Sequence, residues 1–317
     1  MECETTLTGN EPVALTIGNF DGIHRGHQRL MHELRETAAT LDSKPVLVTF
    51  EPHTLLVVRP EIDLQLLTTL EEKLALARQY GGIDDSIVIH FTPEVRAMSA
   101  DEFLDTLRAR FAIRALVVGE DFSLGHRRMG DVPFLQAYGQ KHDILVRPIA
   151  LEEDERERIS STRIRRLVSE GNIGEANELL GHPLTMSGPV VHGDHRGRLL
   201  GFPTANLIPP PHKLIPANGV YAITVTVPSI PSGDSSPTSR VYNGVANIGI
   251  RPTFNGKERL VEAHLLDIER DLYEKRITID FIARLRDEQR FAGIEALKAQ
   301  ITADAQQARQ LLQATGG

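Results

Sequence analysis

The stretch GNFDGIHRGH, residues 18–27, joins the apolar run 12–17 to a segment with helical spacing. A strand, a glycine-rich turn and a helix in this order point several backbone N–H groups at one spot, at the positive end of the helix. This arrangement favours an anion, and His24 and His27 add donors whose charge can change near neutral pH. The stretch therefore predicts a phosphate site at the end of a strand.

Three glycines in this stretch, Gly18, Gly22 and Gly26, allow the backbone to approach a phosphate closely. We include Phe20 and Asp21 in the same predicted ATP site. Two other interpretations stay open: a polar surface turn, and a pair of metal-binding histidines, although no cysteine or carboxylate cluster with zinc-type spacing lies nearby. The chain has no GxxxxGK[ST] sequence, which excludes a P-loop.

The composition of the chain limits its partners and its surroundings. It has 317 residues, a net charge of -8 and no tryptophan, which argues against binding to nucleic acid. One cysteine, Cys3, rules out a disulfide within the chain and fits a reducing compartment. No apolar run reaches the roughly 18 residues of a membrane-spanning helix, and the N-terminus lacks the pattern of a signal peptide. We therefore expect a cytoplasmic protein without a membrane partner, either a monomer or a weak homo-oligomer.

The first half of the chain alternates between two kinds of segment. Short β-branched runs are typical of strands buried on both faces, and helical patterns separate them. One helix is expected to start at Ser99, with Glu102 at capping-box spacing. This alternation predicts a doubly wound parallel sheet of the Rossmann type, which binds ligands beyond the carboxyl ends of its strands. The expected strands are 12–20, 44–50, 86–91, 114–122 and 142–149.

The second half has a different pattern. A charged run opens 151–181 and two helical stretches follow, the first with Ser160 and Ser161 as candidate caps. Beyond Gly181, strand-like runs alternate with turns until a helix near 288–314, which predicts a small antiparallel β-barrel closed by a terminal helix. We expect one domain at 1–182 and another at 183–317, with a long hairpin loop at 228–239.

Ordered motifs along nearly the whole chain carry a family resemblance. GNFDGIHRGH resembles the HxGH signature of nucleotidyltransferases, and ISSTRIR (159–165) resembles their ISSTxxR signature. Further segments resemble flavin-adenylating enzymes in the first half and riboflavin kinase in the second. The chain is thus similar to the bacterial bifunctional riboflavin kinase/FAD synthetase family. The segments are TFEPH (49–53), LTTLEEKLALA (67–77), VGEDFSLGHRRMGD (118–131), LGFPTANL (200–207), NGVYA (218–222), NIGIRPTF (247–254) and VEAHLLD (261–267).

The resemblance implies that the first domain transfers AMP from ATP to FMN and releases pyrophosphate. It assigns His24 and His27 to the ATP phosphates and to the transition state, and it implies that Arg165 supplies permanent positive charge, with Arg163 as a second candidate. Asp121 is the candidate for seating the flavin or the adenylate, and a turn carboxylate without a catalytic role stays open as the alternative. The hydroxyl residues expected at the ATP phosphates are Ser160, Ser161 and Thr162.

The resemblance implies that the second domain phosphorylates the 5′-hydroxyl of riboflavin with ATP. It assigns Thr204 and Asn206 to Mg²⁺, whose preference for oxygen ligands both side chains meet. Glu262 matches the general base that accepts the proton of the hydroxyl. Arg286 lies in a segment that resembles the flavin side of the site. The glycines expected around the ADP phosphates are Gly193, Gly197 and Gly201.

The chain departs from the family pattern in several places. Glu274 replaces a glycine, Thr54 stands where proline is usual, and Leu124 replaces an aromatic residue. The loop at 228–239 is longer than the family needs. These departures leave the residues assigned to chemistry unchanged, but they put the loop motion at 274 and the packing of the flavin ring in doubt.

The sequence disfavours three alternatives to a bifunctional enzyme. In the first, one domain is active and the other only binds flavin, which the presence of both sets of motif residues disfavours. The second is a flavin-binding regulatory or RNA-contacting module, which the acidic charge disfavours. The third is a cytidylyltransferase joined to an unrelated β domain, which the PTAN and VEAHLLD segments disfavour.

Overall fold

The computed structural model describes residues 1–7, 10–150, 157–191, 202–228, 239–253, 256–266 and 272–315. The chain folds as two compact units. Unit 1 comprises Met1–Gln65 and Lys73–Ser161, whereas unit 2 comprises Leu66–Glu72 and Thr162–Gly317. A short segment from the first half of the sequence therefore belongs to the second unit.

Unit 1 is built on a six-stranded sheet with the strand order β1-β4-β3-β2-β5-β6. Strands β2 to β6 pair in parallel, and the edge strand β1 pairs antiparallel with β4. The expected parallel sheet is confirmed, and β1 is an addition that the sequence reading missed. The strands are β1 (Cys3–Thr5), β2 (Pro12–Ile17), β3 (Lys44–Glu51), β4 (Asp85–His90), β5 (Ala112–Gly119) and β6 (Leu145–Ile149).

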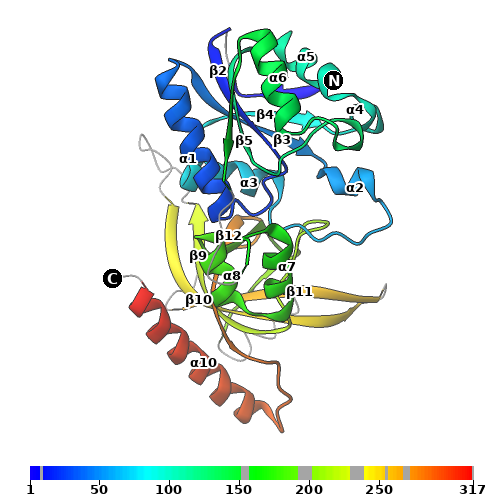
Figure 1. Cartoon of the computed structure of the whole chain (residues 1–317). Helices are drawn as coiled ribbons and strands as arrows, with labels where there is room; N and C mark the ends of the chain where they lie inside the picture. The colour runs from blue at the N-terminus through cyan, green and yellow to red at the C-terminus, as the bar shows by residue number, and fades with distance from the viewer. Residues whose placement is uncertain are drawn as a thin grey trace. The chain divides into compact units, whose positions relative to one another are not determined.

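Helices cover both faces of this sheet (Figure 1). Alternate residues of a strand point to opposite faces, so Leu15 packs in one core cluster with Leu104 and Leu135, while Ala14 packs in the other with Leu34. The fully buried strands explain the uninterrupted apolar runs in the sequence. The helices are α1 (Arg25–Thr40), α2 (Thr54–Val58), α3 (Leu70–Leu76), η1 (Ala77–Gly81), α4 (Pro93–Ala97), α5 (Ala100–Arg108), η2 (His126–Arg128) and α6 (Val132–His142).

Helix starts in unit 1 follow local capping chemistry. Ser99 precedes α5, and its side chain accepts a hydrogen bond from the backbone of Glu102 while the Glu102 carboxylate accepts one from the backbone of Ser99. The predicted capping box is therefore confirmed. At α6, Asp131 caps the helix and proline occupies an early helical position.

Unit 2 contains a closed antiparallel barrel with the strand order β10-β11-β8-β7-β12-β9. The terminal helix α10 (Ile294–Thr315) buries Ala305, Ala308 and Leu312 against Ala222 and Leu266 (Figure 1). The expected barrel with a terminal helix is confirmed. Its strands are β7 (Leu184–Val191), β8 (Ala205–Leu207), β9 (Gly219–Pro228), β10 (Ser239–Thr253), β11 (Gly256–Leu265) and β12 (Arg276–Arg286).

Two helices precede the barrel, α7 (Ser161–Glu170) and α8 (Ile173–Leu180), as the two helical stretches predict. The predicted hairpin joins β9 to β10, which pair from Pro228 and Ser239 onward. Its residues 229–238 lie outside the described part of the chain. Within the described residues, no helix is both long enough and apolar enough to cross a membrane.

Candidate active sites

The loop after β2 leads into the first turn of α1, as the opening motif predicts. Helix α1 begins at Arg25, and His24 is its N-cap residue with φ -64° and ψ 169°. The His24 side chain accepts a hydrogen bond from the His27 backbone N–H at 3.4 Å. Because the first turn contains no acidic residue, the partial positive charge of this helix end is left for an external anion.

The backbone of this loop adopts conformations that L-residues rarely take. Phe20 has a φ of 50° and Ile23 has a φ of 42°, and Gly22 lies between them with a φ of 86°. A Cβ atom added at Gly18 would lie 3.1 Å from the Phe20 ring, so this glycine allows the ring to pack under the loop. A strained loop persists only where its surroundings hold it, and such loops are frequent at functional sites.

The two predicted histidines lie against each other. Their rings stack with centroids 3.6 Å apart, and Phe20 meets His27 edge-on at 5.2 Å. Burial, followed by the charges of His24, Lys73 and Arg158, lowers the pKa of His27 well below its usual value. The lowered pKa favours the neutral imidazole of His27 in the free protein. The neutral imidazole still offers one N–H to an anion.

The second nucleotidyltransferase motif meets the first within unit 1. The Ser161 hydroxyl donates a hydrogen bond to the Asp21 carbonyl at 2.9 Å, and Ser160 directly precedes it. Asp21 itself is 2% exposed. Residues far apart in the sequence are thus joined beside the loop, as the resemblance implies.

The residues of the second motif from Thr162 onward lie on α7 and belong to unit 2. Thr162 is exposed and Arg165 is half-buried. The Arg163 side chain is buried and forms an ion pair with Glu175 at 3.2 Å. The Arg163 guanidinium therefore has a structural partner.

Asp121 follows β5 and forms an ion pair with Arg158 at 2.6 Å. The sequence reading gave Arg158 no role, yet its positive charge reaches His27 and contributes to lowering the pKa of that imidazole. The side chains of Asp121 and Arg158 are both 46% exposed, so either one remains accessible to a ligand.

Lys73 is a buried cation that the sequence reading also missed. Its side chain is 3% exposed, and Nζ donates a hydrogen bond to Thr49 Oγ1 at 3.1 Å. Burial lowers the pKa of Lys73, and the carboxylates of Asp21 and Glu51 oppose that shift. Its charge acts on His27, so Lys73 belongs to the electrostatic surroundings of the phosphate loop.

A signal for Lys73 was present in the sequence. Residues three and four positions apart share one face of a helix, and Leu76 and Ala77, which follow Lys73 at those spacings, are both buried. A lysine on an apolar stripe is unusual because burial of its charge is costly. That mismatch between residue type and position could have identified it.

The predicted kinase residues gather on two paired strands of the barrel. Asn206 on β8 lies directly opposite Glu262 on β11, so the two side chains share one face of the sheet. Thr204 lies just before β8, two residues ahead of Asn206 in the sequence. His264 forms a 2.8 Å hydrogen bond with the Pro203 carbonyl, which fixes the segment before β8.

An unsatisfied oxygen marks this place. Asn206 is 5% exposed, and its Oδ1 atom has no hydrogen-bond partner among the described residues. A buried polar atom normally has a partner, so one without it calls for a ligand, an ion or water. An amide oxygen beside a hydroxyl and a carboxylate is a donor set that suits Mg²⁺.

The remaining predicted residues are distributed as follows. Gly193, Gly197 and Gly201 lie outside the described part of the chain. Arg286 ends β12, where its Nη2 atom lies 2.7 Å from Asp304 Oδ2 of α10, and the two side chains are 16% and 4% exposed. The structure therefore gives Arg286 a partner within the protein.

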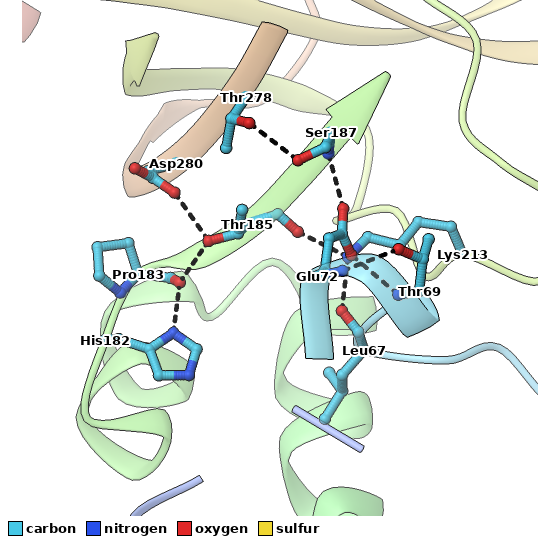
Figure 2. Close-up of polar contacts among 10 residues, drawn as sticks. All are labelled: Leu67, Thr69, Glu72, His182, Pro183, Thr185, Ser187, Lys213, Thr278 and Asp280. Carbon is cyan, nitrogen blue, oxygen red and sulfur yellow. Dashed lines mark hydrogen bonds and ion pairs between the residues drawn. The ribbon is translucent and has the colours of Figure 1, made fainter. Parts of the chain in front are cut away.

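A polar cluster within unit 2 joins the segment 66–72 to the barrel (Figure 2). Lys213 Nζ lies 2.5 Å from Glu72 Oε2, and the two side chains are 0% and 3% exposed. The same ammonium donates to the carbonyls of Leu67 and Thr185, each at 2.6 Å. Glu72 Oε1 accepts a hydrogen bond from the Ser187 backbone at 2.7 Å. All three ammonium donors and both carboxylate oxygens are thus satisfied.

Comparison with known proteins gives two family matches in chain order. A family model described as FAD synthetase matches residues 7–163, and one described as riboflavin kinase matches residues 180–312. A relative named bifunctional riboflavin kinase/FMN adenylyltransferase, from Pseudomonas fluorescens, is 40% identical over 303 residues, which cover 93% of this chain and 92% of the relative. A relative with the same name from Escherichia coli (strain K12) is 38% identical and covers 95% and 93% of the two chains.

A solved structure from Streptococcus pneumoniae, described as a macrolide-efflux protein, has a TM-score of 0.83 to this chain. It is 30% identical, and the match covers 95% of each chain. The similarity extends over both units, and the efflux description applies to that protein alone.

Proposed function

Since this chain belongs to the bifunctional riboflavin kinase/FMN adenylyltransferase family, we propose a specific set of residues for each of its two reactions. The chain carries both activities, phosphorylation of riboflavin and adenylylation of FMN. We assign the adenylyltransferase to residues 1–182 and the kinase to residues 183–317. The proposal extends to ATP as the nucleotide, to Mg²⁺ as the metal, and to a cytoplasmic monomer or weak homo-oligomer.

In adenylyl transfer, an oxygen of the FMN phosphate attacks the α-phosphorus of ATP, and the bond to pyrophosphate breaks. His24, His27 and the N-terminus of α1 stabilise the negative charge that develops on the transferred phosphorus centre. His27 acts as a neutral hydrogen-bond donor, since its pKa is lowered well below the usual value. Arg165 adds positive charge, while Ser160, Ser161 and Thr162 donate to phosphate oxygens.

Gly18, Phe20, Asp21, Gly22 and Gly26 form the backbone that receives the ATP phosphates. The strained φ angles in this loop support that role, because strained backbone is frequent at functional sites. Asp121 would then seat FMN, with the Arg158 guanidinium available to an anionic ligand.

In the kinase reaction, the riboflavin 5′-hydroxyl oxygen bonds to the γ-phosphorus of ATP, the bond from that phosphorus to ADP breaks, and Glu262 accepts the hydroxyl proton. The Asn206 amide oxygen and the Thr204 hydroxyl would hold Mg²⁺, which supplies positive charge to the nucleotide phosphates. The buried Oδ1 atom of Asn206, which has no hydrogen-bond partner in the part of the chain that the structure describes, supports this assignment. Gly193, Gly197 and Gly201 are assigned to the ADP phosphates and Arg286 to the flavin side.

Two contacts between proposed site residues, one within each unit, support the two-site assignment. Ser161 meets Asp21 in unit 1, and Asn206 pairs with Glu262 in unit 2. A protein with one working site would need only one of these arrangements.

One assay tests the assignment. The full chain is incubated with ATP, Mg²⁺ and either riboflavin or FMN, and the flavins are separated by chromatography. Glu262→Gln is expected to stop FMN formation while FAD formation from supplied FMN continues. His24→Ala combined with His27→Ala is expected to do the reverse, with at least a roughly hundredfold loss of adenylyl transfer. Loss of both activities in both variants, with unchanged circular dichroism, would overturn the assignment.

A further inference from the structure

Two hydrogen bonds between Asn19 and Thr54, together called the clamp, hold the phosphate loop, which comprises residues 18–23. Asn19 lies between Gly18 and the strained Phe20. Its Nδ2 atom donates to Thr54 Oγ1 at 2.9 Å, and its Oδ1 atom accepts from the Thr54 backbone N–H at 3.1 Å. One residue thus engages both ends of the Asn19 amide.

The Asn19 backbone is held from a second direction. The Thr49 hydroxyl lies 3.3 Å from the Asn19 carbonyl oxygen as donor, and it accepts a hydrogen bond from Lys73 Nζ at 3.1 Å. Thr49 is fully buried and Lys73 is 3% exposed, so this second contact with Asn19 is anchored in the core. Thr54 holds Asn19 from the other side.

Backbone hydrogen bonds also hold this loop. Gly18 donates to the Val48 carbonyl at 3.0 Å where the strand ends, and Ile23 donates to the Phe20 carbonyl at 3.3 Å. Phe20 and Ile23 both have positive φ angles, which the loop would relax if it were released. The hydrogen bonds to Asn19 therefore restrain the residue next to the strained Phe20.

We propose that Thr54 is a positioning residue for adenylyl transfer. Its two hydrogen bonds to Asn19 keep the loop 18–23 in the conformation that receives the ATP phosphates. The inference rests on the proposed function of this loop.

The role of Thr54 can be separated from a role in stability. Thr54 is the first residue of α2, a helix of five residues with none buried, so little packing depends on it. Proline is well tolerated at the first position of a helix. His53, the residue before it, has φ -52° and ψ 133°, which is the conformation that a following proline requires.

Three substitutions at this position therefore form a graded series. Thr54→Pro removes the hydroxyl and the backbone N–H, and with them both hydrogen bonds, without disturbing the local backbone. Thr54→Val removes the hydroxyl and keeps the N–H. Thr54→Ser keeps both groups and is the matched control.

The experiment measures KM for ATP and kcat for FAD formation from supplied FMN, using the full chain. One hydrogen bond of this type corresponds to roughly a two- to tenfold effect. We expect Thr54→Pro to raise KM for ATP about tenfold or more, Thr54→Val to raise it less, and Thr54→Ser to stay within about twofold. Riboflavin phosphorylation, measured in the same samples, is expected to be unchanged in all three.

A double-mutant cycle with Asn19→Ala completes the test. If the clamp acts as one unit, Thr54→Pro adds little to the effect of Asn19→Ala. Unchanged KM and kcat in Thr54→Pro, or an effect equal to that of the serine variant, would overturn the proposal. A lowered melting temperature with an unchanged KM would assign Thr54 a purely structural role. If the unmodified chain itself formed no FAD, the proposed function would fail instead.

Discussion

Replacing Lys213 by methionine is expected to lower the free energy of unfolding of unit 2 by about 3–5 kcal/mol. Its ammonium is 0% exposed and neutralises Glu72, which is 3% exposed (Figure 2). Methionine fills a similar volume but leaves the Glu72 carboxylate buried without a counter-charge. The Thr185 carbonyl also loses its Lys213 donor, which places the expected loss in the upper half of that range.

A second substitution tests whether the lost charge balance is the cause. Glu72→Gln in the Lys213→Met background removes the uncompensated charge, and the glutamine oxygen can still accept from the Ser187 backbone. The double variant is therefore expected to be more stable than Lys213→Met alone. Lys298→Met is the exposed control, because Lys298 is 41% exposed and its ion pair with Glu295 is 3.9 Å long. That change is expected to cost less than about 1 kcal/mol.

Urea unfolding of the full chain, followed by far-ultraviolet circular dichroism, measures these differences. The chain has no tryptophan, so fluorescence from that residue cannot be used. Loss of riboflavin kinase activity along the same urea series reports on unit 2. A cost below about 1 kcal/mol for Lys213→Met, or a double variant less stable than the single one, would refute the reasoning.

Burial, together with nearby positive charges, holds the pKa of His27 well below its ordinary value of 6.5, so the folded state binds this proton less readily than the unfolded state. The contribution of His27 to the free energy of unfolding is therefore fully present above about pH 6.5. Below that pH the free energy of unfolding falls by at most about 1.4 kcal/mol per pH unit. In unfolding experiments, His27→Gln should make this fall less steep. Glu274→Gly is expected to raise the melting temperature slightly, because Glu274 has a φ of 62° that favours glycine; a lower value would contradict this. Arg286→Met should lower the free energy of unfolding in urea by about 3 kcal/mol, because the buried Asp304 carboxylate loses its counter-charge. Asp304→Asn in the same background should recover part of that loss.

Much of the fold could be predicted because its signals are local. Apolar β-branched runs such as 44–50 read as buried strands, and Ser99 with Glu102 marks a helix start through bonds three residues apart. Strand β1 was missed because three residues, Cys3–Thr5, carry too little periodicity to be distinguished from an irregular end. Its place at the sheet edge depends on pairing with β4, which is distant in sequence.

Site residues could be proposed from the sequence only where they lie within a recognisable motif. His24, Asn206 and Glu262 lie in such motifs, whereas Lys73 and Arg158 contribute through their spatial proximity to His27. Charge interactions of this kind depend on burial and distance, and neither can be read from composition. The two hydrogen bonds of Thr54 to Asn19 were likewise hidden, because the two residues lie 35 positions apart in the sequence.

The segment 66–72 has a practical consequence for anyone who divides this protein. It lies within the adenylyltransferase half of the sequence, but it is part of the compact body that contains the barrel. A gene cut between the two halves would leave Glu72 on one product and Lys213 on the other. Separate expression of the kinase half would then require an added copy of this segment, or a mutation that removes the unmatched lysine.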